Sequence, residues 1–211
     1  MARFAAREPD VRLLEILDRV DEPAALRVLD LGCAAGRNTA VFAERGFDFH
    51  AVDGSRAMVE HTRGRVADLL GNAEAERRVR HGRMDDLGRF ADGSFDLVVA
   101  LGVYHCAASG EEWHGAVAET SRILVPRGGL LVSVFTPETD LHGRSIEPVP
   151  GEPNVYSGFP SGRTFLLHQD DLDRAMAGHG LEPAVPSRTV RVELEKGRRV
   201  VVNALYSKEP S

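Results

Sequence analysis

Hydrophobic positions along the chain follow two different spacings, and the change from one to the other divides the sequence into elements. Short, almost continuously apolar runs are typical of buried strands, whereas apolar residues three and four apart are typical of helices. Strands are predicted over 27–31, 47–53, 78–84, 95–101 and 130–135. Helices are predicted over 10–20, 36–45, after Ser55 as N-cap, 110–124 and 168–180. This alternation predicts βαβ units and a parallel sheet covered on both faces.

The last third of the chain departs from this alternation. Residues 137–164 hold many of the prolines and glycines and show no period, which predicts a long loop. Long loops in compact domains usually serve a function. Residues 189–206 form two apolar runs around Lys196 and Gly197, which predicts a β-hairpin at an antiparallel edge of the sheet. We therefore expect residues 1–211 to form a single α/β domain, with an N-terminal helical segment over 1–25.

Composition restricts the classes of protein and partner. Of 211 residues, 43% are hydrophobic and 27% charged, which excludes collagen-like, disulfide-framework and largely disordered chains. A net charge of −6 with scattered arginines argues against a nucleic-acid or anionic-membrane partner. The chain has two cysteines, no apolar run long enough to span a bilayer, and no apolar stretch typical of a signal peptide at its N-terminus. These features predict a cytoplasmic protein.

The glycine-containing segment 28–46 carries the clearest chemical signal. A predicted strand runs into Asp30 and Gly32, and a helix begins near Gly36. A tight turn at this point directs backbone N–H groups and the positive end of the helix toward a ligand. Asp53 ends the next strand, 17 residues after Gly36, where a carboxylate can accept hydrogen bonds from the ribose hydroxyls of a nucleoside. The segment therefore predicts a nucleoside-containing ligand at the carboxyl ends of the strands.

Two nucleotide-binding patterns can be compared with this loop. The dinucleotide fingerprint G-x-G-x-x-G does not match residues 32–36, GCAAG. The loop instead resembles motif I of the class I S-adenosylmethionine-dependent methyltransferases, E/D-x-G-x-G-x-G, through Asp30, Gly32 and Gly36. Ala34 stands where the family usually has its middle glycine. Alanine at this position costs little conformational energy if its φ is negative, although its methyl group leaves less room for a ligand.

The resemblance to this family, of the small-molecule type 11/25 group, extends over about residues 26–136. Residues 50–55 resemble the ribose-binding segment and 81–87 the adenine loop, in which Arg83 replaces the usual acid. Residues 90–106 resemble the fourth-strand motif, and 123–135 resemble the R-x-L-x-P-G-G turn before strand five. The cofactor-binding residues that the resemblance implies are Asp30, Gly32, Cys33, Ala34, Gly36, Arg37, Asp53, Gly54, Ser55, Met84, Asp85, Leu101 and Gly102.

The family resemblance implies a fold and a reaction. The fold is a Rossmann-like, seven-stranded, mostly parallel sheet with one antiparallel strand and helices on both faces. The reaction is methyl transfer from S-adenosylmethionine to a small-molecule acceptor by in-line displacement, which leaves S-adenosylhomocysteine. Because the cofactor carries an activated leaving group, the enzyme mainly supplies proximity and orientation.

The residues after the fourth predicted strand are candidates for the acceptor side. Tyr104 and His105 are the predicted catalytic residues; His105 is either a general base or a packed histidine that holds the loop. Residues 137–167 are a possible cover of the acceptor pocket, with candidate lining residues Tyr156, Phe159 and Arg163. The alternative is that this segment only covers the sheet edge.

Further expectations concern metals, thiols and rival functions. The histidines show no metal-ligand spacing, so no metal is predicted. Cys33 and Cys106 are more typical of small packing residues than of nucleophiles. Two rival functions remain open: a nicotinamide-dependent oxidoreductase, disfavoured by the missing third glycine, and a non-catalytic cofactor-binding or assembly protein on the same fold.

Overall fold

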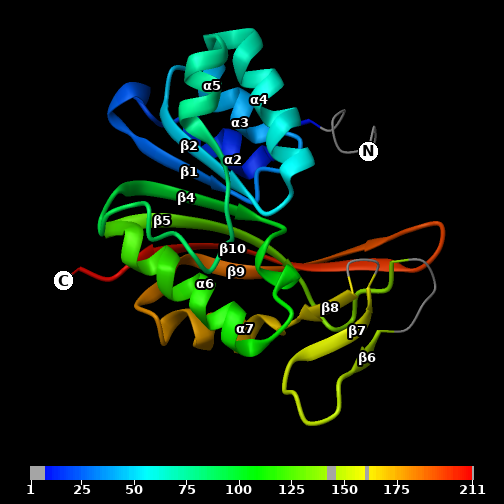
Figure 1. The fold of residues 1–211 in the computed structure, drawn as a ribbon. Coiled ribbons are helices and arrows are strands. Elements are labelled where there is room, and N and C mark those ends of the chain that lie inside the picture. Colours follow the sequence, from blue (N-terminus) through cyan, green and yellow to red (C-terminus); the bar gives the residue numbers. More distant parts are fainter. Residues whose placement is uncertain (1–7, 142–145, 160–161, 211) are drawn as a thin grey trace.

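The fold is known from a computed structural model, which describes residues 8–141, 146–159 and 162–210 (Figure 1). Its central seven-stranded sheet has the order β3-β2-β1-β4-β5-β10-β9. The strands are β1 (Arg27–Leu31), β2 (Asp48–Asp53), β3 (Val79–His81), β4 (Phe95–Leu101), β5 (Leu124–Phe135), β9 (Leu181–Glu193) and β10 (Arg198–Lys208). Strands β1 to β5 pair in parallel, whereas β10 is antiparallel to both β5 and β9. The predicted mostly parallel sheet with one antiparallel strand is confirmed.

Helices cover both faces of this sheet (Figure 1). One layer contains α2 (Val11–Leu17), α3 (Arg37–Glu44), α4 (Arg56–Leu70) and α5 (Asn72–Arg78). The other contains α6 (Gly110–Ile123) and α7 (Gln169–Ala177), and two 3-10 turns, η1 (Pro23–Ala25) and η2 (Tyr104–Cys106), lie in connections. Ser55 caps α4 as predicted, because its hydroxyl accepts a hydrogen bond from the Met58 N–H at 3.5 Å.

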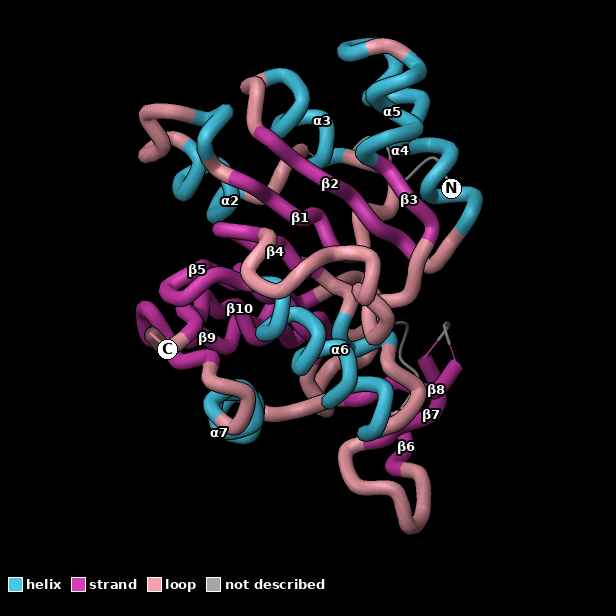
Figure 2. Tube along the Cα trace, turned by 60° about the vertical axis from the view of Figure 1, so that its left-hand side comes forward, coloured by secondary structure: helices cyan, strands magenta, loops and turns pink. Residues whose placement is uncertain are grey.

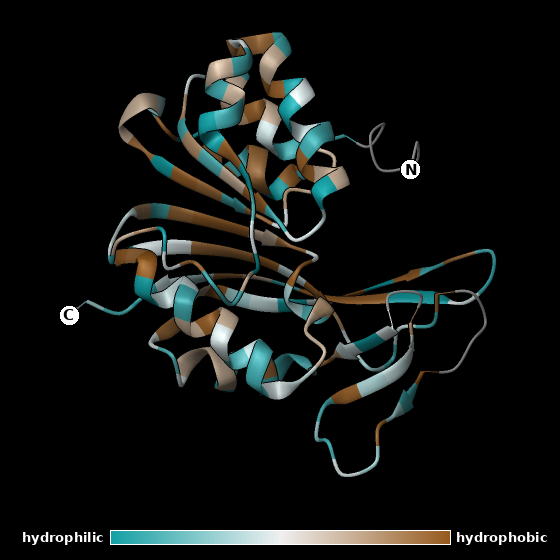
Figure 3. Cartoon of the chain, in the orientation of Figure 1, coloured by the Kyte–Doolittle hydropathy of each residue, from teal (hydrophilic) through white to brown (hydrophobic). Residues whose placement is uncertain are grey.

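Two hydrophobic cores lie on opposite faces of the sheet because neighbouring strand residues point to opposite sides. In β1, Val28 belongs to the core under α2–α5, whereas Leu29 and Leu31 belong to the core under α6 and α7. Figure 3 shows the hydrophobic residues concentrated along the central strands. This double coverage explains why these strands are continuous apolar runs in the sequence.

The described residues between 137 and 164, which exclude 142–145 and 160–161, do not form the irregular loop that their composition predicts. Within the described part, a second sheet of order β6-β7-β8 contains β6 (Glu147–Pro148), β7 (Val155–Phe159) and β8 (Gly162–Phe165). Figure 2 shows this small sheet beside the N-terminal half of α6. Its strands have five residues or fewer, which is too short to show a recognisable alternation.

Three further boundaries differ from the prediction. Helix α5 occupies Asn72–Arg78, so the predicted strand 78–84 is reduced to Val79–His81. The predicted turn before strand five lies inside β5, where Arg127 has φ of 64° and the register with β4 shifts. Strand β9 begins at Leu181 and not at 189, because its first residues already pair with β10.

Candidate cofactor and acceptor site

The loop between β1 and α3 is shaped by two glycines at positive φ. Gly32 has φ of 75° and Gly36 has φ of 77°. A Cβ atom on Gly32 would lie 2.7 Å from Val103 Cβ, and one on Gly36 would lie 2.9 Å from Thr62 Oγ1. The N–H groups of Gly32 and Cys33 both donate to the Val52 carbonyl, at 2.8 and 3.1 Å. Close packing of this loop against Val103, just before η2, and against Thr62 of α4 therefore requires the two glycines, whether or not a ligand binds.

Asp53 lies at the end of β2, directly beside this loop. Its Oδ2 accepts a hydrogen bond from the Ala34 N–H, and its Oδ1 accepts one from the Ser55 N–H, both at 2.8 Å. Ala34 has φ of 49°, so the condition under which alanine costs little there is not met. The Thr62 hydroxyl donates to the Ala34 carbonyl at 2.8 Å and helps to hold this conformation. The structure thus brings Asp53, Ala34 and Ser55 together.

Asp30 lies under the same loop and is almost completely buried, with 3% of its surface exposed. Burial raises the pKa of its carboxyl group to about 6. The hydrogen bond that Thr39 Oγ1 donates to it at 2.5 Å lowers the pKa, but by less than burial raises it. Arg37, at the start of α3, donates to the Glu8 carbonyl at 2.9 Å. The Cys33 thiol is buried and its pKa is raised, again mainly by burial, which disfavours a reactive thiolate.

The loop after β3 contains the residues predicted to contact adenine. Met84 is partly buried and packs against the α6 side of the core. The Asp85 carboxylate receives two hydrogen bonds of 2.8 Å from Arg83, which also forms an ion pair with Glu112 at 3.1 Å. The bonds from Arg83 hold the pKa of Asp85 below its usual value. Gly54 is exposed, and its carbonyl lies 3.0 Å from His81 Nε2.

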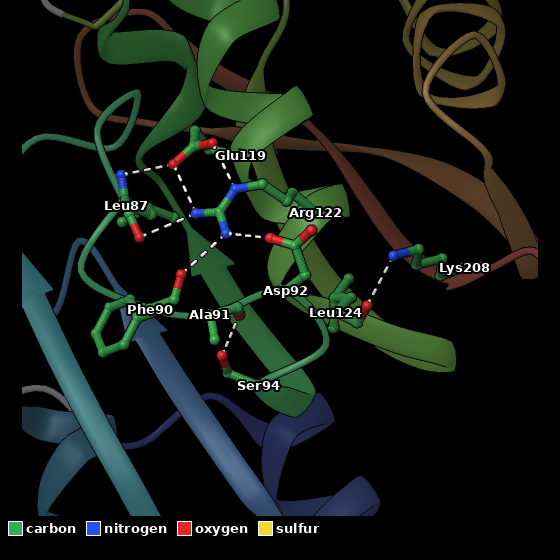
Figure 4. A network of polar contacts seen from close by, with 9 residues as sticks. All are labelled: Leu87, Phe90, Ala91, Asp92, Ser94, Glu119, Arg122, Leu124 and Lys208. Carbon is green, nitrogen blue, oxygen red and sulfur yellow. Dashed lines mark hydrogen bonds and ion pairs between the residues drawn. The ribbon is translucent and has the colours of Figure 1, made fainter.

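A network of hydrogen bonds and ion pairs, which the sequence did not predict, connects this loop to α6 (Figure 4). Arg122 donates to the carbonyls of Leu87 and Phe90 at 3.1 and 2.9 Å, and to the carboxylates of Asp92 and Glu119. Glu119 in turn accepts a hydrogen bond from the Leu87 N–H at 2.9 Å. The available signal was Arg122 itself, the first residue of the R-x-L-x-P-G-G-like turn.

The two predicted catalytic residues lie in η2, after β4, and have different surroundings. Tyr104 is completely buried, and its hydroxyl donates to Thr120 Oγ1 at 2.7 Å. Burial raises its pKa, and this geometry favours a packing role over contact with substrate. His105 is 8% exposed, and burial lowers the pKa of its imidazole to about 4. Leu101 is partly buried, and Gly102 is exposed with φ of 89°.

The small sheet packs onto this same region. Thr164 Oγ1 donates to the His105 carbonyl, and Arg163 Nε donates to the Ala108 carbonyl at 3.1 Å. The Phe159 ring lies 5.5 Å from that of Phe135 at the end of β5. Tyr156 is half-buried in the middle strand, opposite Pro148 and Thr164. Of the three predicted lining residues, Arg163 therefore contacts the segment after β4, and Phe159 contacts Phe135 at the end of the neighbouring strand β5.

Two further features lie outside these loops. A shallow cleft of about 310 Å³ is lined by Trp113, His114, Asn154, Phe165, Leu167, Asp171, Arg174 and Ala175. None of these belongs to the predicted cofactor site. Within the described ranges, no group of three or more His, Cys, Asp and Glu side chains could hold a metal ion. Likewise, no helix among the described residues is long and apolar enough to cross a membrane.

Comparison with known proteins fits this geometry. Residues 28–128 match a family model described as a methyltransferase domain. The demethylmenaquinone methyltransferase of Renibacterium salmoninarum is 28% identical over 182 residues, covering 78% of this chain and 70% of that protein. The domain match agrees with the resemblance drawn from the motifs: residues 28–128 contain a methyltransferase domain.

Solved structures share the fold at lower identity. The 1,6-didemethyltoxoflavin-N1-methyltransferase of Burkholderia thailandensis, with bound 1,6-didemethyltoxoflavin and S-adenosylhomocysteine, has a TM-score of 0.67 at 22% identity; 94% of this chain and 75% of that chain are covered. CalS10, an amino pentose methyltransferase from Micromonospora echinaspora with bound S-adenosylmethionine, has a TM-score of 0.61 at 23% identity, with 96% and 94% covered. These likenesses establish the Rossmann-like methyltransferase fold.

Proposed function

We propose that this protein transfers the methyl group of S-adenosylmethionine to a small-molecule acceptor. The observation that carries the proposal is the contact between the Asp53 carboxylate and the Ala34 N–H at 2.8 Å. It joins the ends of β1 and β2 at the carboxyl edge of a parallel sheet, where ligands of open α/β folds bind. The matched methyltransferase domain contains both residues.

The residues present suit the cofactor. Each oxygen of Asp53 accepts one backbone hydrogen bond, which leaves each with a lone pair for the ribose hydroxyls. The loop from Gly32 through Cys33 and Ala34 to Gly36, with Asp30 beneath it and Arg37 after it, would hold the methionine part. The remaining proposed cofactor-binding residues are Gly54, Ser55, Met84, Asp85, Leu101 and Gly102.

The chain itself has to supply orientation and little else. Bound S-adenosylmethionine supplies a sulfonium-activated methyl group for in-line displacement. Holding an acceptor in line with that group replaces a bimolecular encounter by an oriented one, an effect worth about 7–11 kcal/mol in favourable cases. No obligatory proton-transfer residue is needed if the acceptor atom is already nucleophilic.

Several observations support a small acceptor. The R. salmoninarum and B. thailandensis relatives carry names of enzymes that modify small molecules. The net charge of −6 makes an RNA or DNA acceptor unfavourable. Free cysteines, Cys33 and Cys106, suit the reducing conditions of the cytoplasm, where we place the activity.

Calorimetry tests the cofactor assignment. S-adenosylmethionine and S-adenosylhomocysteine should bind in the micromolar range, as is ordinary for enzyme ligands. The substitution Asp53→Asn should weaken binding by about 10–100-fold, because hydrogen bonds to a charged acceptor contribute about 1.5–3 kcal/mol. Asp48→Asn, on the exposed first residue of the same strand, is the matched control. If Asp53→Asn binds S-adenosylmethionine as tightly as the wild type does, Asp53 is not part of the cofactor site.

Turnover and ligand choice separate the rival functions. Release of S-adenosylhomocysteine with any member of a panel of small hydroxyl, amine and thiol acceptors supports an enzyme. Binding of S-adenosylmethionine without turnover of any acceptor supports the non-catalytic alternative. Binding of NAD(H) or NADP(H) with no heat from S-adenosylmethionine would contradict the proposal.

A further inference from the structure

His105 occupies a restricted position beside the end of β4. Its ring centroid lies 4.4 Å from that of Phe135, and its carbonyl accepts the Thr164 hydroxyl. Only 8% of the residue is exposed. His105 is therefore held by a ring contact from β5 and by a hydrogen bond from β8 to its backbone carbonyl, although both elements are distant from it in the sequence.

The two ring nitrogens of His105 are not equivalent. Nδ1 is fully buried and has no hydrogen-bond partner among the described residues. Burial is the single cause of the lowered pKa, so no described charged group offsets it and the ring is neutral near pH 7. A neutral imidazole carries its proton on one nitrogen and a lone pair on the other.

The environment of Nδ1 determines the tautomer. Buried N–H groups without a partner are rarer in proteins than buried acceptors without one. The lone pair of His105 therefore belongs on Nδ1, and the proton on Nε2. A ring in this state presents a hydrogen-bond donor at its accessible nitrogen and has no free lone pair there to accept a proton.

Two aromatic rings lie near His105. Phe135 lies against His105, and Phe159 of the small sheet lies 5.5 Å from Phe135 at an interplanar angle of 48°. Such rings favour contact with flat, apolar surfaces. A flat ring is therefore the kind of acceptor that the residues around His105 favour.

From this arrangement, and resting on the proposed function, we infer that His105 binds the methyl acceptor as a hydrogen-bond donor through Nε2–H. The acceptor class that fits is a planar ring compound with a carbonyl or similar proton-accepting oxygen next to the methylated atom. His105 then orients the acceptor while the acceptor atom displaces the methyl group from the sulfonium sulfur and loses its own proton to solvent. This role differs from both sequence-based alternatives, the general base and the packed histidine.

The tautomer can be measured without any acceptor. A long-range ¹H–¹⁵N correlation spectrum of the ¹⁵N-labelled protein between pH 5.5 and 8 should show His105 with a protonated Nε2 and an unprotonated Nδ1. The resonance is assigned by its absence in His105→Gln. A proton on Nδ1, or a titration of the ring within this range, would overturn the inference whether or not the protein is a methyltransferase.

Two substitutions then separate donor, base and packing roles. His105→Gln keeps an N–H donor but cannot act as a base near neutral pH, whereas His105→Leu has no donor. His61→Gln, at an exposed position of α4, is the matched control. The acceptor probes are two pairs that differ in a carbonyl: xanthine and purine, and 2-acetyl-1-naphthol and 1-naphthol.

We expect the carbonyl member of at least one pair to be methylated about tenfold or more better in kcat/KM than its partner. His105→Leu should lose about 10–100-fold on that acceptor, mainly in KM, while His105→Gln stays within about tenfold of wild type with an unchanged pH profile. Affinity for S-adenosylmethionine should be the same in all variants.

Each opposite result has a distinct meaning. Equal losses in His105→Gln and His105→Leu, or a rate that depends on a histidine pKa, would overturn the donor role in favour of a base. Weaker S-adenosylmethionine binding in both variants would indicate packing only. S-adenosylmethionine binding without methylation of any of the four probes would overturn the acceptor class. Failure to bind S-adenosylmethionine at all would contradict the proposed function instead.

Discussion

The proposed cofactor side and the proposed acceptor side of this site are built in different ways. The loop after β1 is held by backbone groups: N–H donors reach the Val52 carbonyl and the Asp53 carboxylate over short stretches of sequence. The segment after β4 is held by side chains from residues far along the chain, such as Thr164 on the His105 carbonyl and Phe135 on its ring.

This difference has a functional consequence. A ligand that is the same in every methyltransferase can be held by backbone geometry, which depends on few side chains. An acceptor that differs between enzymes requires side chains that can be exchanged without disturbing the sheet. Because the small β6-β7-β8 sheet contacts the acceptor side, changes there should alter acceptor choice and leave the cofactor loop intact.

The largest expected effect comes from placing a side chain in the cofactor loop. Gly32→Ala puts a methyl group 2.7 Å from Val103 Cβ at a positive φ. Overpacking and left-handed backbone together should cost about 2–5 kcal/mol of unfolding free energy. Gly46→Ala is the control, since its φ of 75° equals that of Gly32 but no atom lies within 4 Å of its Cβ.

Gly46→Ala should cost only about 1–2 kcal/mol, the backbone part alone. Urea unfolding of both variants measures the difference, which isolates the close approach to Val103. Equal costs would show that packing beneath the loop is not what requires glycine at position 32.

A buried acid on the cofactor side should make stability depend on pH. The pKa of Asp30 is about 6 in the fold, above the ordinary 3.8, so the folded protein binds this proton more tightly than the unfolded chain. The contribution of Asp30 to the unfolding free energy is therefore most favourable below about pH 4, declines as the pH rises to about 6, and then levels off. The total is on the order of 2–3 kcal/mol.

Asp30→Asn should remove this slope and raise the unfolding free energy at pH 7.5 by up to that amount, since the amide oxygen can still accept from Thr39. Denaturant unfolding between pH 4 and 8 measures it, with Asp18→Asn at an exposed position as control. If the stabilised variant binds S-adenosylmethionine more weakly, Asp30 lowers the stability of the fold but is needed to bind the cofactor.

A smaller effect is expected on the acceptor side. Thr164→Val removes the hydroxyl that donates to the His105 carbonyl but keeps nearly the same shape in a fully buried position. Leaving that carbonyl unpaired should cost about 1–2 kcal/mol and raise the acceptor KM. S-adenosylmethionine affinity, measured by calorimetry, should not change; if it falls as well, the two sides are not independent.

The smallest effect is expected at the exposed Arg83. Its bonds to Asp85 and Glu112 lie at the surface, where ion pairs contribute about 0–1 kcal/mol. Arg83→Gln should therefore leave stability within 1 kcal/mol and should not weaken S-adenosylmethionine binding, because it frees Asp85. A marked loss of affinity in calorimetry would show that Arg83 itself contacts the cofactor.

Much of the parallel sheet could be predicted because its strands are buried on both faces. The predicted runs 27–31 and 95–101 coincide with β1 and β4 residue for residue. Helix α5 was missed because it is a short, mostly charged segment, in which only Ala75 is buried. The β6-β7-β8 sheet was missed because its strands are short and pair with one another inside a segment rich in proline and glycine.

The turn between β1 and α3, which is the proposed cofactor loop, was predictable because its signal lies in neighbouring residues. Its pattern of Asp30, Gly32 and Gly36 is local, since turn geometry and helix start depend on neighbouring residues. The clamp from Arg122 and Glu119 to Leu87 joins residues more than 30 positions apart, and nothing in the adenine loop itself indicates it.

The amino-acid sequence by itself thus determined the fold class, the alternation of strands and helices, and the resemblance to methyltransferases. These follow from hydrophobic spacing and from glycines and acids at strand ends. Only the tertiary structure decided how each candidate side chain is used. Tyr104 and His105 are neighbours in the sequence, yet Tyr104 donates to Thr120 within the core whereas the His105 ring packs against Phe135. Burial and long-range contacts set their protonation and partners, and neither is encoded in the residues beside them.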